Sequence, residues 1–165
     1  MCFHGPGGMQ SLFGVRMDDL TIITTAAAFR EGSPACAAWR DAITAIRHAV
    51  FTLEQGIDAG ADLDGRDAGA VHVLAEVDGD AVGTGRLLPN GHIGRLAVLR
   101  AWRGRGIGGA LLDALIEAAR RRGLKRVYLG AQARASGFYE KHGFRVCGEP
   151  YVEVGITHMR MERGL

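Results

Sequence analysis

The stretch from residue 93 to residue 131 constrains the fold more than any other part of the sequence. Its hydrophobic pattern alternates over 93–99, repeats with a helical period over 107–122, and returns to a strand pattern over 126–131. Gly123 follows the last helical turn, a position where glycine commonly ends a helix. This order predicts a strand–helix–strand unit, whose right-handed crossover would place the two strands parallel.

The segment before this unit predicts antiparallel strands. Residues 71–77, 81–88 and 93–99 are β-prone, and the turns Asp78-Gly79-Asp80 and Pro89-Asn90-Gly91 separate them. Glycine accepts the positive φ that tight hairpin turns need, so these runs predict a meander. The predicted fold is α+β, with a mixed, mostly antiparallel central sheet and flanking helices.

Weaker signals complete the assignment of elements. Apolar residues spaced by three to five predict a helix over 35–53, and a polar, glycine-broken segment with four aspartates predicts a loop over 58–69. A short helix is predicted over 134–142, with strands over 144–148 and 157–163. Arg47, His48 and Arg86 are expected to be solvated or paired with acidic groups, and His72 and Glu76 to face water.

Length and composition favour one domain. Residues 1–18 are glycine-rich without periodicity, so we expect a flexible N-terminal tail followed by a single domain over 19–165. No apolar run is long enough to cross a membrane, and the N-terminus lacks the pattern of a signal peptide. The three cysteines have no metal-ligand spacing, which indicates free thiols in the cytoplasm and no metal site.

Charge is distributed unevenly along the chain. Residues 1–94 hold six basic and twelve acidic groups, whereas residues 95–126 hold nine basic and two acidic groups. Most of the basic residues are arginine, whose planar guanidinium suits bidentate contacts with phosphate. A phosphate-bearing partner is therefore expected near 95–126. The whole chain carries only +2 and has no aromatic residues interleaved with this block, which argues against nucleic-acid binding.

A glycine- and arginine-rich loop, residues 103–109, connects the strand predicted over 93–99 to the helix predicted over 107–122. Glycines there allow backbone N–H groups to point at an anion, and the helix N-terminus adds partial positive charge. The segment also matches G-x-G-x-x-G at Gly104, Gly106 and Gly109. A dinucleotide-binding unit would place an acidic residue about 20 positions further on, where this chain has Gly130 and Ala131.

Two segments together resemble a known family. Arg95-Leu-Ala-Val-Leu99 with Trp102-Arg-Gly-Arg-Gly-Ile-Gly108, and Phe138-Tyr-Glu-Lys-His-Gly-Phe144, are similar to the GNAT superfamily of acetyl-CoA-dependent N-acetyltransferases. Its pyrophosphate motif, Q/R-x-x-G-x-G/A, falls on Arg103, Gly106 and Gly108. Glu54-Gln-Gly-Ile57, Gly83-Thr-Gly-Arg-Leu87 and Gly155-Ile-Thr-His158 are most similar to the small bacterial ElaA/YjcF-like branch.

The resemblance implies acetyl-CoA as co-substrate and a set of residues that contact it. The strand holding Leu96, Ala97 and Val98 is implied to splay from its neighbour and to pair through its backbone with the pantetheine arm. Gln132 stands where the family often has asparagine, and Phe138 is implied to wall the arm or to pack in the core. The implied cofactor residues are Leu96, Ala97, Val98, Arg103, Gly104, Arg105, Gly106, Ile107, Gly108, Gly109, Gln132 and Phe138.

The resemblance also implies catalytic roles. Tyr139 matches a tyrosine that protonates the departing thiolate, a reasonable role for a phenol. The base is left open between Glu54, His158 and Glu149. The implied activity is direct transfer of acetyl to an amine acceptor, a small molecule or a peptide, in a ternary complex. The alternatives are a non-catalytic acyl-CoA-binding or regulatory module and, on the glycine pattern alone, a nicotinamide-dinucleotide protein; a homodimer is expected from family habit.

Overall fold

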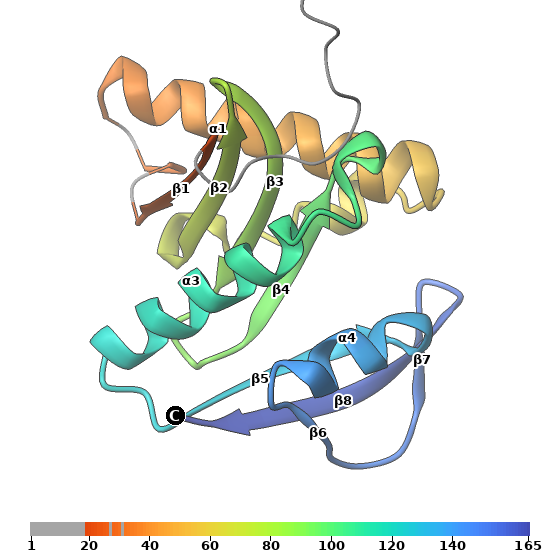
Figure 1. Ribbon diagram of the computed structural model, residues 1–165. Helices are drawn as coiled ribbons and strands as arrows, with labels where there is room; N and C mark the ends of the chain where they lie inside the picture. Colours follow the sequence, from red (N-terminus) through yellow and green to blue (C-terminus); the bar gives the residue numbers. More distant parts are fainter. Residues whose placement is uncertain (1–18, 27, 31) are drawn as a thin grey trace, which may run out of the picture.

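The computed structural model describes residues 19–26, 28–30 and 32–165 of the 165-residue chain, so the predicted tail over 1–18 lies outside the described residues. Two antiparallel sheets form the body (Figure 1). The first has the order β1-β2-β3-β4, from β1 (Leu20–Thr25), β2 (Val71–Val77), β3 (Asp80–Leu87) and β4 (Ile93–Val98). The second has the order β5-β8-β6 with β7 also on β8, from β5 (Arg126–Gln132), β6 (Arg145–Val146), β7 (Tyr151–Glu153) and β8 (Ile156–Gly164).

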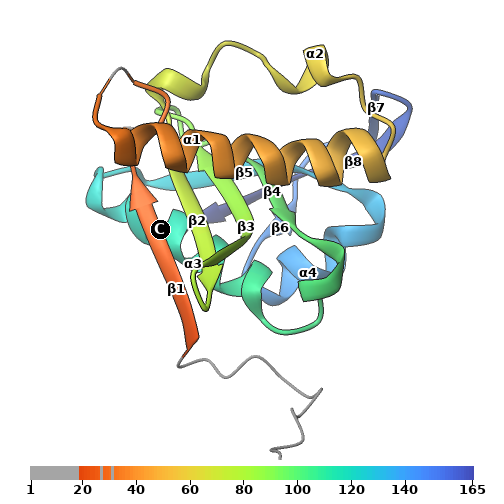
Figure 2. The ribbon, with the colours of Figure 1, turned by 90° about the horizontal axis from the view of Figure 1, so that it is seen from above.

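Helices cover both faces of the first sheet (Figure 2). The helix α1 (Pro34–Arg47) continues without interruption into a π-helix, η2 (His48–Glu54), and together they account for the helix predicted over 35–53. On the opposite face lies α3 (Ile107–Arg121). The smaller elements are α2 (Ala59–Asp62), η3 (Asp67–Gly69), η4 (Arg100–Trp102), η5 (Ala133–Ala135) and α4 (Ser136–Lys141).

Alternation along β2 explains the two-sided core. Val73 and Ala75 pack in the cluster that contains α3, whereas Leu74 packs with Ile43 and Ile46 of α1. Successive side chains of a strand point to opposite faces, so β2, which is covered on both sides, carries apolar residues on both faces. The predicted α+β fold and meander are confirmed. The strands β1 and β7 and the helix α2 were not predicted.

The predicted parallel pairing forms only in part. Between β4 and β5 the described residues have a single parallel bridge, His92 to Tyr128, and the strands then part. A bulge accompanies the separation: Thr84 pairs with Ala97 and Arg86 with Gly94, so two residues of β4 oppose Gly85 alone. A bulge bends its strand, and here it carries β4 away from β5.

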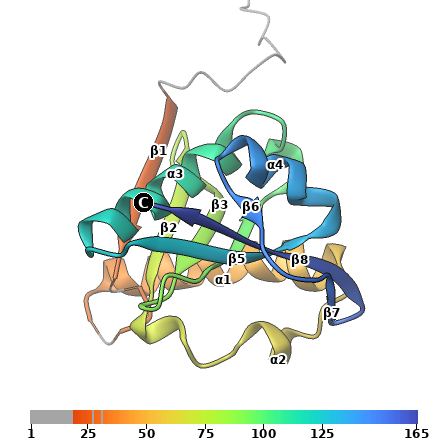
Figure 3. The same ribbon diagram turned by 90° about the horizontal axis from the view of Figure 1, so that it is seen from below.

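The second sheet is built on β8. This strand pairs with β5, with β6 and with β7, and lies between β5 and β6 in Figure 3. The strand predicted over 144–148 is reduced to β6 because only Arg145 and Val146 pair with β8. Among the described residues, no helix combines the length and apolar character needed to cross a membrane.

Candidate active site

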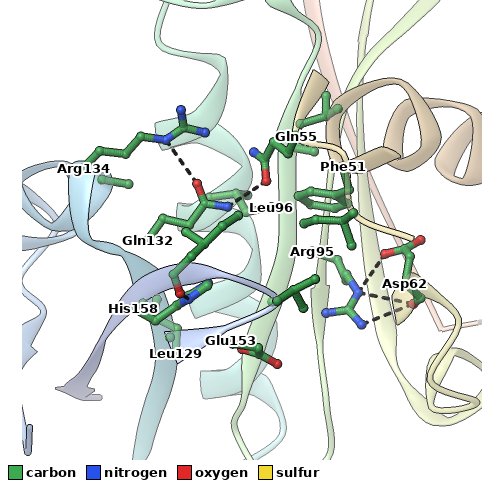
Figure 4. Close-up of a pocket in the computed structure, with 18 of the residues that line it drawn as sticks. Phe51, Gln55, Asp62, Arg95, Leu96, Leu129, Gln132, Arg134, Glu153 and His158 are labelled. Carbon is green, nitrogen blue, oxygen red and sulfur yellow. Dashed lines mark hydrogen bonds and ion pairs between the residues drawn. The ribbon is translucent and has the colours of Figure 1, made fainter. Parts of the chain in front are cut away.

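A pocket of about 820 Å³ opens where β4 and β5 part. Its walls come from β4, β5, the π-helix η2 and the β7–β8 hairpin (Figure 4). The bulge residue Arg95 has a positive φ of 53°, an uncommon conformation for a residue other than glycine. Strained backbone of this kind concentrates at functional sites, which agrees with the position of the bulge in the pocket wall.

The pocket exposes one edge of β4. Leu96, Ala97 and Val98 all line it, and β4 has its ladder partner, β3, on the other side only. Ala97 is buried in the core as a side chain, so its contribution to the pocket comes from the backbone. An unpaired strand edge offers N–H and C=O groups to an extended ligand.

The glycine–arginine loop leads from β4 into α3. Gly106 is the N-cap residue of α3, with a positive φ of 82°, and no side chain caps this helix end. Because the first N–H groups of a helix have no intrahelical acceptor, they stay available to an anion. A Cβ atom at Gly104 or Gly106 would meet no atom within 4 Å, so the loop leaves room for a phosphate group.

The remaining loop residues divide between surface and core. The Arg105 guanidinium stacks over the Trp102 ring at 5.0 Å. The Ile107 side chain is buried in the core, so only its backbone can reach a cofactor. A Cβ atom at Gly109 would lie 3.1 Å from the His142 ring, and one at Gly108 would lie 3.6 Å from the Phe138 ring. These two glycines therefore allow α4 to pack closely on α3.

Arg103 joins the loop to the opposite wall. Its Nε donates to the carbonyl of Val98 at 2.9 Å, and its Nη2 lies 2.9 Å from the carboxylate of Glu54 at the end of η2. Both side chains line the pocket. Glu54, a predicted base candidate, is thus a partner of the predicted phosphate-binding arginine.

Gln132 spans the pocket. Its Nε2 donates to Gln55 Oε1 at 2.7 Å, and its Oε1 accepts from Arg134 Nε at 3.1 Å. Figure 4 shows the Gln132–Gln55 bond bridging β5 and the segment after η2. Gln55 was not predicted, since its partner is 77 residues away in the sequence.

Tyr139 lies in the pocket wall on α4. Burial raises the pKa of Tyr139 to about 12, so the phenol keeps its proton at neutral pH. Its ring packs edge-on against Phe138 and Phe144, with centroids 5.0 and 5.9 Å away. Phe138 packs against His142 and the N-terminal turn of α3 rather than lining the pocket. Its predicted role as a wall of the cofactor arm stays a prediction.

His158 is the best-oriented base candidate. It lines the pocket from β8, and its Nδ1 lies 2.8 Å from the carbonyl of Ile156. A carbonyl can only accept, so a neutral His158 carries its proton on Nδ1 and leaves Nε2 as a proton acceptor. The ring stacks on Tyr151 at 5.5 Å. The third candidate, Glu149, is exposed and does not line the pocket.

Beside the pocket lies an Arg–Asp cluster, which we define as Arg47, Arg86, Arg95, Asp62, Asp64 and Asp67. Arg47, Arg86 and Asp67 are buried, whereas Asp62 and Arg95 line the pocket. Arg47 bonds Asp62 and Asp67 at 2.8 and 2.9 Å, while Arg86 bonds Asp64 and Asp67 at 2.7 and 2.9 Å. Arg95 reaches Asp62 at 2.9 Å and Asp64 at 3.4 Å. The cluster fixes the segment 58–69, predicted as a plain loop, against β3 and α1.

Titration of the cluster follows from these pairs. The hydrogen bond from Arg86 holds the pKa of Asp64 well below its ordinary value, against the effect of burial. Burial raises the pKa of Asp67, but the guanidinium groups of Arg47 and Arg86 outweigh this effect, so the pKa of Asp67 is also lowered. His72 was predicted to face water, and this was wrong: it is buried, its Nε2 lies 2.9 Å from the carbonyl of Asp67, and burial lowers its pKa.

Comparison with known proteins tests the resemblance. Residues 51–165 match the family described as the acetyltransferase (GNAT) domain. The uncharacterized N-acetyltransferase YjcF of Bacillus subtilis is 34% identical over 120 residues, which is 70% of this chain and 86% of YjcF.

Solved structures agree. The crystal structure of Escherichia coli ElaA has 31% sequence identity and a TM-score of 0.75, covering 87% of this chain and 99% of ElaA. A GNAT family acetyltransferase from Elizabethkingia anophelis with acetyl-CoA bound has 21% identity and a TM-score of 0.62 over 90% of this chain and 99% of its own, a likeness of fold. With a domain match over most of its length and relatives such as ElaA and YjcF, the chain belongs to the GNAT family of N-acetyltransferases.

Proposed function

We propose that this protein moves an acetyl group from acetyl-CoA to an amine acceptor by direct transfer in a ternary complex. One observation carries the proposal: the free edge of β4 and the Tyr139 side chain line one pocket together with Arg103, the first residue of the loop that leads to the uncapped N-terminus of α3. Acetyl-CoA is the bound ligand in the Elizabethkingia relative, whose fold this chain shares.

The residues fit acetyl-CoA in the following way. Its phosphate groups would lie on the open loop around Gly104 and Gly106, next to the first N–H groups of α3. Its pantetheine arm would run along the free edge of β4, and Gln132 would contact it from β5. Bound acetyl-CoA supplies an activated acetyl group. The backbone N–H near Val98 would polarise the acetyl carbonyl.

Proton transfer falls to two side chains. The Nε2 of His158 would accept the proton that the acceptor amine loses as its new bond to the acetyl carbon forms. Tyr139 would donate its proton to the sulfur as the carbon–sulfur bond breaks. Glu54 is the less favoured base because it is already paired with Arg103. The described free cysteines, Cys36 and Cys147, do not line the pocket, which favours direct transfer over an acyl-enzyme.

The first experiment measures thermal unfolding with acetyl-CoA, CoA and NAD in parallel. A ligand at 100 times its dissociation constant adds about 2.7 kcal/mol to the free energy of unfolding. We expect a shift with acetyl-CoA and CoA but not with NAD. A shift with NAD alone would contradict the proposal. A CoA shift with no acetylated product against a broad amine panel would favour the non-catalytic acyl-CoA-binding module.

The second experiment substitutes the proposed acid. Tyr139→Phe removes only the hydroxyl, so we expect turnover to fall about 100-fold or more while the acetyl-CoA shift persists. Tyr128→Phe is the matched control, because Tyr128 lies on β5 but does not line the pocket. An unchanged rate in Tyr139→Phe would exclude the acid role. The homodimer and the cytoplasmic location expected from the sequence stay predictions.

A further inference from the structure

The β7–β8 hairpin presents two pairs of side chains to the pocket. Tyr151 lies opposite His158, and Glu153 lies opposite Ile156. All four line the pocket, whereas Val152 and Thr157, which alternate with them, do not. Residues two apart in a strand share a face, so the hairpin turns this face to the pocket.

Glu153 is an unmatched charge. The other carboxylates in the pocket wall are paired: Glu54 with Arg103 at 2.9 Å, and Asp62 with Arg95 at 2.9 Å. Within 19–26, 28–30 and 32–165, Glu153 has no ion pair and no side-chain hydrogen bond. Its carboxylate is close enough to add to burial in raising the pKa of Tyr151.

An unmatched charge of the opposite sign lies at the other end of the pocket. The Arg134 guanidinium donates to Gln132 and, among the described residues, has no carboxylate partner. Figure 4 shows Arg134 beyond Gln132 and Glu153 on the far side of His158. The positive end suits the anionic acetyl-CoA, which leaves the negative end facing the acceptor.

The tip of the hairpin is strained. Val154 and Gly155 have positive φ values of 49° and 73°, the pattern of a type I′ turn. A β-branched residue is disfavoured in this conformation, where asparagine would be accommodated easily. Val154 is nevertheless 56% exposed and lines the pocket, together with Phe51, Ile57 and Ile156. The hairpin end of the pocket therefore combines one free carboxylate, Glu153, with the apolar side chains of Val154 and Ile156.

We propose, on the basis of the function above, that the acceptor is an amine bearing a second positive charge, which Glu153 holds. The reacting amine would lie at His158, and the second cation at Glu153, one side-chain pair nearer the hairpin tip. Two residues of a strand span about 7 Å, so a short alkyl chain connects the two groups. The apolar side chains around Val154 would contact that chain. Glu153 is thus a specificity-determining residue.

The test compares three acceptors that each contain four carbon atoms: 1,4-diaminobutane, butylamine and 4-aminobutanoate. Their far ends are an ammonium group, a methyl group and a carboxylate, respectively. We expect kcat/KM for the diamine to exceed that for butylamine by about tenfold, the scale of one hydrogen bond to a charged group. The aminobutanoate should be the poorest acceptor.

Substitution assigns the preference to one residue. Glu153→Gln should bring the ratio of diamine to butylamine close to one, and Glu153→Lys should make 4-aminobutanoate better than the diamine. Glu140→Gln on α4 is the control, because Glu140 is exposed and outside the pocket wall. Since Glu153 is itself exposed, these variants should fold.

The outcomes separate this proposal from the proposed function. Equal rates for the diamine and butylamine overturn it, and a preference for 4-aminobutanoate assigns the acceptor end to Arg95 instead. If no compound is acetylated, calorimetric titration of each into the CoA complex decides: diamine binding that Glu153→Gln abolishes supports the proposal, and no diamine binding overturns it. Failure of the proposed function appears independently, as a missing thermal shift with CoA.

Discussion

The Arg–Asp cluster and the pocket lie next to each other, but they differ in whether their charged side chains have ion-pair partners. In the cluster, the carboxylates of Asp64 and Asp67 lie within 3 Å of arginine nitrogens, and Arg47 and Arg86 are almost completely buried. In the pocket wall, Arg134 and Glu153 have no ion-pair partner among the described residues. Matched buried charges fix a loop, whereas unmatched charges in a cavity are available to a ligand.

We expect the largest effect on stability from a variant that removes one arginine of the Arg–Asp cluster. Arg86→Met leaves the buried Asp67 and the partly exposed Asp64 without one of their cationic partners. Removing one member of a buried ion pair costs about 3–5 kcal/mol, so the free energy of unfolding should fall by this amount. Urea unfolding measures it.

The control for this variant is Arg121→Met. Arg121 is exposed near the end of α3, and a surface substitution of this kind changes stability by about 0.5 kcal/mol or less. A loss of less than 1 kcal/mol in Arg86→Met would show that the cluster does not hold the fold.

A second variant changes the glycine–arginine loop, where we expect the phosphate groups of CoA to bind. Gly106→Val places a branched side chain at a φ of 82°, beside the first N–H groups of α3. We expect the affinity for CoA to fall at least tenfold, which is about 1.4 kcal/mol, in a calorimetric titration.

Gly123→Val is the matched control for backbone strain. Gly123 follows the other end of α3, has a φ of 72°, and likewise leaves a Cβ atom free of contacts within 4 Å. Both variants should lose stability, but only Gly106→Val should lose CoA affinity. Equal affinities in the two variants would remove the glycine–arginine loop from the binding site.

The smallest effect concerns pH. Pairing with Arg86 depresses the pKa of folded Asp64 below its ordinary value of 3.8. The stabilisation is therefore present above that value and is lost as the pH falls toward the depressed pKa. Asp64→Asn should unfold more easily than the natural protein at pH 7, by about 1 kcal/mol, since the carboxylate is partly exposed.

The free energies of unfolding of Asp64→Asn and the natural protein should approach each other in acid. Urea unfolding at decreasing pH should show the difference shrinking below about pH 4, because the carboxyl of Asp64 takes up a proton more readily in the unfolded chain than in the folded protein. A difference that stays constant down to pH 2 would mean that the charge of Asp64 contributes nothing to stability.

Local signals explain which parts of the fold were predictable. The strand β2 has its predicted bounds, and α3 ends one residue before its predicted end, because Asp78-Gly79 and Gly123 mark chain reversals that depend on neighbouring residues only. The short strand β7 exists through pairing with β8, which no local pattern specifies, and the extent of that pairing also reduces the strand predicted over 144–148 to β6. The bulge at Arg95 likewise depends on β3 across the ladder.

The site divides in the same way. The glycine–arginine loop and Tyr139 were recognised because their residues are contiguous motifs, and Arg103 of the loop and Tyr139 line the pocket. The buried state of Arg47, Arg86 and His72 was not predicted. Their partners in 58–69 lie between 5 and 22 residues away and follow no period, so a polar loop and its charged partners resemble solvated groups in the sequence.

The attachment of β7 has an evolutionary consequence. This strand pairs with β8 alone, and Val152, Glu153 and Val154 are exposed, so the hydrophobic core does not depend on their identity. A descendant can therefore alter or lengthen this hairpin without losing the fold or the loop at Gly106. Selection for new substrates is free to act on one exposed turn, while the rest of the enzyme is inherited unchanged.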